Sequence, residues 1–324
     1  MKTNFGFWIL TILLLTSAPP AEAQQAKVPK IGLLSSTSFL GGQRDSLLRE
    51  LRPLGYVEGK NIAIEFRSAG NKLDRLPALV EELVGLKVDV LVVGTTPAAL
   101  AAKAATRTIP IVFYRVSDPI TIGLIDSLAR PGGNITGVTD ISAMLAGKRL
   151  ELLKETAPKL SRVAVLWNPQ ETSAAQDWKE SQPVARALSL QLHSMAVSSA
   201  DRYAGAFQEA MKAGSAALAV TSHTLARSNH KQIDALASKN RWPAIYWRGD
   251  FVDRGSLMSY GPDEAEPIKR IAVFVDKILK GTKPADIPVE QPKKFEFIVN
   301  LKAAKQIGLT IPPNVLVRAD RVIK

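Results

Sequence analysis

Apolar residues in this chain occur in short runs, each followed by a polar loop and then by an amphipathic or alanine-rich segment. The run at residues 88–93 is rich in β-branched side chains and too short for a helix, which is typical of a buried parallel strand. Thr95 and Thr96 can cap the helix expected over residues 98–105, and a second buried strand is expected at 109–116. This strand–helix–strand unit indicates an α/β fold with a parallel sheet.

The same alternation continues on both sides of that unit. In the first half it predicts strands at 30–34, 61–66 and 135–138, and helices at 43–54, 74–86 and 120–129. In the second half it predicts strands at 162–166, 192–197, 216–220 and 244–247, and helices at 146–156, 204–213 and 225–239, with a further helix ending near 188. Two similar α/β lobes in tandem are therefore expected.

The chain is expected to cross between these lobes three times. The first crossing is expected at the strand that begins at residue 135. The strand at 256–260 and the helix at 264–279 are expected to return to the first lobe, and the strand at 294–300 with the helix at 301–307 to the second. The fold class is thus two Rossmann-like lobes with parallel sheets and a three-crossing hinge, divided as residues 24–136 plus 256–290 and residues 137–255 plus 291–324.

Three strands of the first lobe end in loops rich in Ser, Thr and Asp. Because the carboxyl ends of parallel strands meet at one edge of a sheet, where open α/β sheets bind ligands, these loops should form one wall of a cleft. The side chains expected to contact a ligand are Ser36, Thr37, Thr95, Thr96, Ser117 and Asp118. For Thr95, Thr96 and Asp118 the alternative is that they only cap helices, and a simple N-cap is the favoured explanation of Asp118, which precedes Pro119. A capped helix start still suits a carboxylate, because it points N–H groups outward.

The second lobe is expected to cover the ligand with Asn168, Ser222 and an aromatic side chain from Tyr246 or Trp247. Aromatic rings at strand ends can pack against a planar or apolar ligand, although each ring could instead belong to ordinary core or interdomain packing. His223 lies at a loop, where it either contacts a ligand or serves as a solvated or core hydrogen bonder.

The N-terminus has the pattern of a secretory signal peptide. Lys2 precedes an apolar run at residues 5–15, and small residues flank Glu22, so removal of residues 1–23 is expected after Ala23. A retained membrane anchor is the alternative, but the run is short and prolines 19 and 20 interrupt the segment after it. An exported protein is therefore expected.

The amino-acid composition excludes several classes of function. The 324 residues include no cysteine, which excludes disulfides, thiol chemistry, cysteine metal sites and a lipid-attachment cysteine. The formal net charge of +12 raises the question of nucleic-acid binding, but the basic residues are scattered along helices and export separates the protein from nucleic acid. A solvated basic surface is the favoured interpretation.

The sequence carries no recognisable catalytic signature. It has no GxGxxG, P-loop, GxSxG or HExxH pattern, and its three histidines are not spaced as metal ligands. We therefore expect no enzymatic activity, no cofactor and no metal, although missing motifs alone do not exclude an enzyme.

Several short motifs occur in succession between residues 29 and 323. They are LGYVEGKN at 54–61 with RLP at 75–77, GTTPA at 94–98, TIPIVF at 108–113 with DP at 118–119, RPGGNITG at 130–137, GKRLELLK at 147–154, and NLKAA at 300–304 with GLTIP at 308–312. Each is weak alone, but their order and spacing resemble the ABC transporter substrate-binding family related to tryptophan and tyrosine binders.

This resemblance implies a type I periplasmic-binding fold that traps a small solute when its lobes close. It also implies delivery of that solute to a membrane permease powered by a separate ATPase. The chain departs from the family in two ways: some relatives are lipoproteins, whereas this chain lacks cysteine, and many carry glycine where Ser117 stands. The second difference adds a side chain where backbone could approach a ligand, which bears on the ligand's identity.

Together these features predict a non-enzymatic, monomeric, periplasmic solute-binding protein of an ABC importer. An amino acid, with an aromatic one as the leading guess, is the expected solute. Closure has to be stabilised by contacts made only in the closed state. Two alternatives remain open: a sensory module that signals to a membrane receptor, and a secreted α/β enzyme with an unrecognised site.

Overall fold

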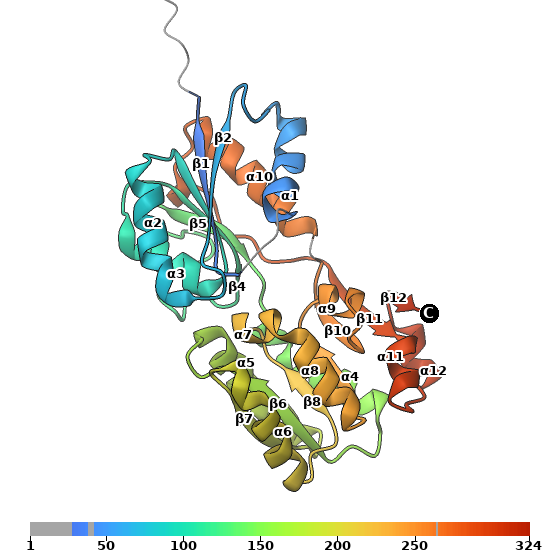
Figure 1. Cartoon of the computed structure of the whole chain (residues 1–324). Helices are drawn as coiled ribbons and strands as arrows, with labels where there is room; N and C mark the ends of the chain where they lie inside the picture. The colour runs from blue at the N-terminus through green and yellow to red at the C-terminus, as the bar shows by residue number, and fades with distance from the viewer. Residues whose placement is uncertain (1–27, 38–41, 264) are drawn as a thin grey trace, which may run out of the picture.

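The computed structural model describes residues 28–37, 42–263 and 265–324, and the expected signal peptide lies outside these ranges. Two α/β lobes lie one above the other, as Figure 1 shows. The described chain begins in the first lobe and ends in the second. None of the described helices has the length and apolar character needed to cross a membrane.

The first lobe is built around a five-stranded parallel sheet in the order β2-β1-β3-β4-β5. Its strands are β1 (Lys30–Ser35), β2 (Ala63–Ser68), β3 (Val90–Gly94), β4 (Ile111–Val116) and β5 (Ile135–Thr139). Its helices are α1 (Gly42–Leu51), α2 (Leu76–Gly85), α3 (Thr96–Ala105) and α10 (Ala265–Leu279), with short 3-10 turns η1 (Arg52–Leu54), η2 (Leu73–Arg75) and η5 (Pro284–Asp286).

Helices cover both faces of this sheet, which explains the continuous apolar runs of its strands. Within β3, Val90 and Val92 pack with α1 and α10, while Leu91 and Val93 pack with α2 and α3. Successive strand residues point to opposite faces, so a strand buried on both faces needs apolar side chains at every position.

The second lobe contains a seven-stranded sheet in the order β12-β11-β10-β9-β8-β6-β7. Its strands are β6 (Arg162–Trp167), β7 (Gln191–Ala196), β8 (Leu218–Val220), β9 (Ala244–Tyr246), β10 (Met258–Pro262), β11 (Phe295–Asn300) and β12 (Arg321–Ile323). Its helices are α4 (Ala146–Thr156), α5 (Thr172–Ala187), α6 (Tyr203–Lys212), α7 (Thr224–Ser228), α8 (His230–Lys239), α9 (Gly249–Asp253), α11 (Leu301–Gln306) and α12 (Pro313–Val317), with η3 (Ala143–Leu145) and η4 (Ala200–Arg202). Only the β10–β11 pair of this sheet is antiparallel in the described chain, so the predicted pair of mainly parallel sheets is confirmed.

The chain passes between the lobes three times, but two of these passages differ from the expected positions. The strand expected at 256–260 does not return to the first lobe, because Met258 of β10 pairs with Ile245 of β9 and Val299 of β11. The first passage comes later than residue 136, since Thr139 of β5 still pairs with β4. The chain thus passes from one lobe to the other after β5, between β10 and α10, and between η5 and β11.

The helix expected over residues 120–129 does not form; a turn over residues 119–123 is followed by bends and irregular backbone. The carbonyl group of Pro119 accepts hydrogen bonds from the N–H groups of Leu124 and Ile125, and Gly123 has a φ of 66°. A positive φ interrupts a right-handed helix, and glycine adopts it without a steric penalty.

Candidate functional site

A polar cavity lies between the lobes, at the carboxyl ends of strands from both sheets. It contains about 430 Å³ of unfilled space, part of it open to solvent. The first lobe lines it with Thr37, Thr95, Thr96, Pro97, Arg115 and Asp140. The second lobe lines it with Glu171, Ser173, Ser222, His223, Thr224, Arg227, Trp247 and Arg248. This is the edge at which α/β sheets place their ligands.

The start of α3 presents hydroxyl groups and a helix N-terminus to the cavity. Thr95, the residue before the helix, has a φ of 102°, which is unfavourable for a residue with a Cβ atom. Its hydroxyl group shares a hydrogen bond of 2.5 Å with the Ser36 hydroxyl group, which helps to hold this conformation. Thr96 begins α3 and is 6% exposed, so its side chain lines the cavity from a fixed position.

A bulge near the end of β4 brings Arg115 into the cavity. Arg115 has a φ of 58°, and the register against β5 shifts between Tyr114 and Val116. An extra residue in a strand changes the direction of the side chain beside it. The guanidinium group of Arg115 lies 5.2 Å from the centre of the Tyr114 ring, a cation–π distance.

Two side chains of the second lobe cap α7 and line the cavity at the same time. The carboxylate of Glu171 accepts the Thr224 N–H at 3.0 and 2.9 Å, and the Asn168 side-chain amide donates to it at 3.2 Å. Burial raises the pKa of Glu171, while these donors favour its ionised form. The Nδ1 atom of His223 accepts the Ala226 N–H at 3.1 Å. The position of this loop is therefore set by α7.

His223 is a neutral hydrogen-bond donor in this wall. Burial lowers its pKa to about 3, and Nδ1 acts as an acceptor, so the proton resides on Nε2. Nε2 has no hydrogen-bond partner among the described residues. The ring stacks against Trp247, with centroids 6.3 Å apart and an interplanar angle of 17°. The pair offers a bound molecule one N–H group beside an aromatic surface.

Replacing His223 with asparagine is expected to reduce the loss of stability in acid. The unfolded chain binds a proton on His223 near pH 6.5, whereas the folded protein resists protonation until about pH 3, so this residue destabilises the folded state as the pH falls. Between pH 6.5 and 5 the wild type should lose about 2 kcal/mol more free energy of unfolding than the variant. Asparagine can still cap α7. Urea unfolding at each pH provides the measurement, and parallel curves for the two proteins would contradict the assignment.

A cluster of arginines around Asp250 lies on the second-lobe side of the cavity. The carboxylate of Asp250 lies 3.1 Å from Arg248, 3.7 Å from Arg227 and 3.3 Å from Arg254. Burial opposes ionisation of Asp250, but the charges of Arg248, Arg227, Arg115 and Arg254 outweigh it and lower its pKa to about 2. Asp250 is therefore a carboxylate that several guanidinium groups share.

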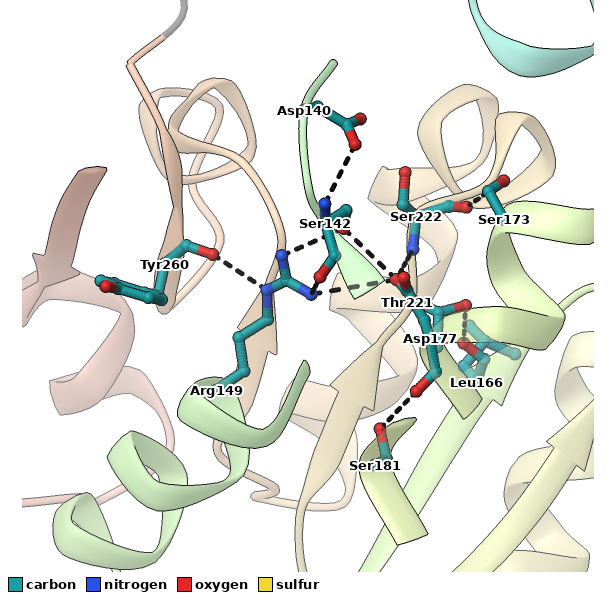
Figure 2. A network of polar contacts seen from close by, with 10 residues as sticks. All are labelled: Asp140, Ser142, Arg149, Leu166, Ser173, Asp177, Ser181, Thr221, Ser222 and Tyr260. Carbon is teal, nitrogen blue, oxygen red and sulfur yellow. Dashed lines mark hydrogen bonds and ion pairs between the residues drawn. The ribbon is translucent and has the colours of Figure 1, made fainter. Parts of the chain in front are cut away.

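A buried polar network adjoins the cavity through Asp140, Ser173 and Ser222, and Figure 2 shows its residues. The guanidinium group of Arg149 donates to the carbonyl oxygens of Tyr260 and Ser142 at 2.9 and 3.1 Å and to the Ser142 hydroxyl group at 3.1 Å. Its Nη1 atom lies 3.8 Å from Oδ2 of Asp177, which accepts the Ser222 N–H at 2.7 Å. The network joins two passages between the lobes to the loop that carries Ser222.

The carboxylates of this network are removed from water. Burial raises the pKa of Asp177 to about 7, against the Arg149 charge and the Ser222 N–H, and Oδ1 of Asp177 has no partner among the described residues. Burial also raises the pKa of Asp140, whose Oδ1 accepts the Ser142 N–H at 3.0 Å. Within the described ranges no three His, Cys, Asp or Glu side chains are grouped so as to hold a metal ion.

The structure brings half of the expected site residues together at the cavity. Thr37, Thr95, Thr96, Ser222 and Trp247 line it. Trp247 is closely supported by β10, because a Cβ atom on Gly261 would collide with the Trp247 carbonyl oxygen. These residues keep their expected place at strand ends.

The other expected residues lie outside the lining. Ser36 reaches Thr95, and Ser117 is buried after β4. Asp118 accepts the Thr121 N–H at 3.1 Å within a turn and caps no helix, because the helix expected after it does not form, and Asn168 donates to Glu171. Tyr246 is fully buried in the second lobe and donates its hydroxyl hydrogen to Asp234 at 2.5 Å, so it does not face the cavity.

Sequence reasoning missed the charged residues of the cavity. These are Arg115, Asp140, Glu171, Arg227 and Arg248. A usable signal existed for two of them: Arg115 is the one charge in an apolar strand, and Arg248 follows a strand directly. Arg227 lies inside an expected helix, where a charge is ordinary.

Comparisons with known proteins agree over nearly the whole chain. The family described as "ABC transporter substrate binding protein" matches residues 27–323. A tyrosine-binding protein of Clostridioides difficile (strain R20291) is 27% identical over 288 residues, which cover 89% of this chain and 83% of that protein.

Solved structures extend this agreement to the fold. A conserved domain protein from Vibrio cholerae is 30% identical with a TM-score of 0.84, covering 91% of this chain and 100% of that one. An ABC domain from Streptococcus pneumoniae in complex with L-Trp is 26% identical with a TM-score of 0.80, covering 90% and 100%. The fold is that of type I periplasmic-binding proteins, as expected.

Proposed function

Because the chain belongs to the family of ABC transporter substrate binding proteins, we propose that it captures an amino acid between its lobes, with an aromatic one as the leading candidate. The observation that carries this proposal is the cavity, in which hydroxyl groups and a helix start face an aromatic pair across the lobes. Relatives described as binding tyrosine or holding L-Trp support the choice of cargo.

Each part of an amino acid has a complementary group in the cavity. The hydroxyl groups of Thr37 and Thr96 and the N-terminus of α3 suit the α-carboxylate. Asp140 suits the ammonium group, and the rings of Trp247 and His223 suit a planar side chain. Since these groups come from both lobes, a bound molecule stabilises the arrangement in which the lobes approach each other.

We also propose where the protein acts and which membrane components receive its cargo. Residues 1–23 are removed on export, and the mature chain acts as a monomer in the periplasm without a lipid anchor. It delivers its cargo to a membrane permease that a separate ATPase drives. It carries out no chemical step on the cargo.

Production from the full-length gene in a bacterium with a periplasm tests these statements together. The intact mass of the periplasmic protein reports whether residues 1–23 are removed. Thermal melting is then recorded with each of the twenty amino acids, since a ligand at a hundred times its Kd adds roughly 2.7 kcal/mol of stability. A raised Tm with one or a few amino acids, recovered unchanged, is expected. No shift with any amino acid would overturn the proposed cargo, and turnover would overturn the non-enzymatic role.

Replacing Thr96 with valine is expected to weaken cargo binding roughly tenfold while leaving the melting temperature nearly unchanged. Valine keeps the shape of threonine but removes the hydroxyl group, which costs about 1–1.5 kcal/mol when the hydrogen bond is made to the cargo. Titration calorimetry provides the measurement. Thr106 is the control at the opposite end of α3: its hydroxyl group accepts from the N–H groups of Thr108 and Ile109, so its valine variant should keep full affinity. Equal affinities in wild type and Thr96→Val would remove Thr96 from the site.

A further inference from the structure

The charges that line the cavity are not those that a neutral amino acid requires. Arg115, Arg227 and Arg248 line it together with only two acids, Asp140 and Glu171. An amino acid with an uncharged side chain brings one carboxylate and one ammonium group. The three arginines outnumber the two lining acids by one, whereas such an amino acid brings no net charge.

Both lining acids are already engaged by groups of the protein. Glu171 accepts hydrogen bonds from the backbone of Thr224 and the side chain of Asn168 at the start of α7. Asp140 accepts the Ser142 N–H and lies near the charges of Arg149 and Arg248. Part of their negative charge is therefore offset by groups outside the lining, so the two acids only partly balance the three arginines.

The arginines of the second lobe converge on one point. Arg227 and Arg248 both approach the Asp250 carboxylate, and their side chains are only 12% and 8% exposed. Arg254 holds the same carboxylate from an exposed position outside the lining. Two largely buried guanidinium groups of the second lobe thus line the cavity and contact the same carboxylate, and water screens them little.

We propose that the cargo is an amino acid whose side chain carries an anionic group, which Arg227 and Arg248 bind while the first lobe holds the α-carboxylate. This inference rests on the proposed capture of an amino acid and names the class of its side chain. Arginine suits this role because its planar fork binds carboxylates in two places at once. Trp247, which also lines the cavity, accommodates an aliphatic or aromatic spacer.

Matched pairs of ligands test the proposal on the unmodified protein. The pairs are L-glutamate with L-glutamine, and 4-carboxy-L-phenylalanine with 4-carbamoyl-L-phenylalanine, which have nearly the same shape and differ in one negative charge. In titration calorimetry the acid of at least one pair should bind at least tenfold more tightly than its amide, with a preference that shrinks as NaCl is raised. Equal or tighter binding of the amides, or of L-tryptophan over every acid, would overturn the inference while leaving the proposed function intact. Failure of every amino acid to bind would instead overturn the proposed function.

Two variants assign the preference to the cavity arginines. Arg227→Gln and Arg254→Gln each remove one positive charge and one contact with Asp250, but only Arg227 lines the cavity. The acid-over-amide preference should fall at least fivefold in Arg227→Gln and remain unchanged in Arg254→Gln. An equal effect in both variants would show that Arg227 acts only through the overall positive charge of the region and not by binding the anionic group. Should Arg227→Gln fail to fold by its melting curve, Arg248→Gln replaces it under the same criteria.

Discussion

Replacing Arg149 with methionine is expected to lower the free energy of unfolding by about 3–5 kcal/mol, because it leaves the Asp177 carboxylate buried without its cation. Both side chains are almost fully buried, at 3% and 0% exposure. The change also removes the donors to Ser142 and to the carbonyl oxygen of Tyr260. Urea unfolding at pH 7.5 provides the measurement.

Lys148 provides the control on the same helix. It pairs with Glu151 at 2.5 Å, but both side chains are 38% exposed, and exposed pairs contribute about 1 kcal/mol or less. Lys148→Met should therefore change stability little. Similar losses in the two variants would show that Arg149 does not act through a buried charge.

The pH dependence gives the same prediction a second test. Burial already raises the pKa of Asp177, and without Arg149 the folded protein would retain a proton there that the unfolded chain, with a carboxyl pKa near 3.9, releases. The folded state then gains stability as the pH falls from 7.5 to 5. The loss caused by Arg149→Met should therefore be smaller at pH 5 than at pH 7.5.

Replacing Trp247 with leucine is expected to weaken cargo binding roughly thirtyfold. The indole ring lines the cavity and stacks with His223, and the loss of buried area and ring contact with the cargo costs about 2 kcal/mol. Leucine retains apolar volume against Phe251, whose ring centroid lies 4.5 Å from that of Trp247. Titration calorimetry with the best ligand of the thermal screen provides the measurement.

Trp242 provides a control that distinguishes a loss of cargo affinity from a loss of stability. It belongs to the same buried cluster and stacks on Phe207 at 5.5 Å, but it does not line the cavity. Both leucine variants should lose a few kcal/mol of stability, because each leaves unfilled space in a core. Only Trp247→Leu should lose affinity, and a matching loss in Trp242→Leu would mean that general loosening of the lobe explains the effect.

Much of the fold can be predicted from local sequence, because most strands here are β-branched runs buried on two faces. The failures are those that depend on distant partners. The strand that became β10 is placed in the wrong lobe because its neighbours, β9 and β11, are chosen by pairing and not by its own residues. The absent helix at 120–129 has a helix-compatible pattern, and only the backbone conformation of Gly123 and the packing of Leu124 and Ile125 exclude it.

The residues of the candidate site show the same difference between features set by local sequence and features set by distant parts of the chain. Thr96, Ser222 and Trp247 follow strand ends, and that position is visible in the sequence. Tyr246 and Trp247 are adjacent, so their side chains point in different directions, and the sequence offers no way to choose between them. Arg115 reaches the cavity through a bulge with a positive φ at a residue other than glycine, which no local pattern predicts.

The two ends of the described chain lie in different lobes, with β1 near the start in one and β12 at the end in the other. A fluorescent donor joined ahead of residue 28 and an acceptor joined after residue 324 would therefore be attached to different lobes. Rotation of one lobe against the other would change the distance between the dyes, and with it the efficiency of energy transfer. If the proposed cargo closes the lobes, the connectivity that builds the cavity would thus make the dye-labelled chain a ratiometric optical sensor for that cargo, without any change inside the binding site.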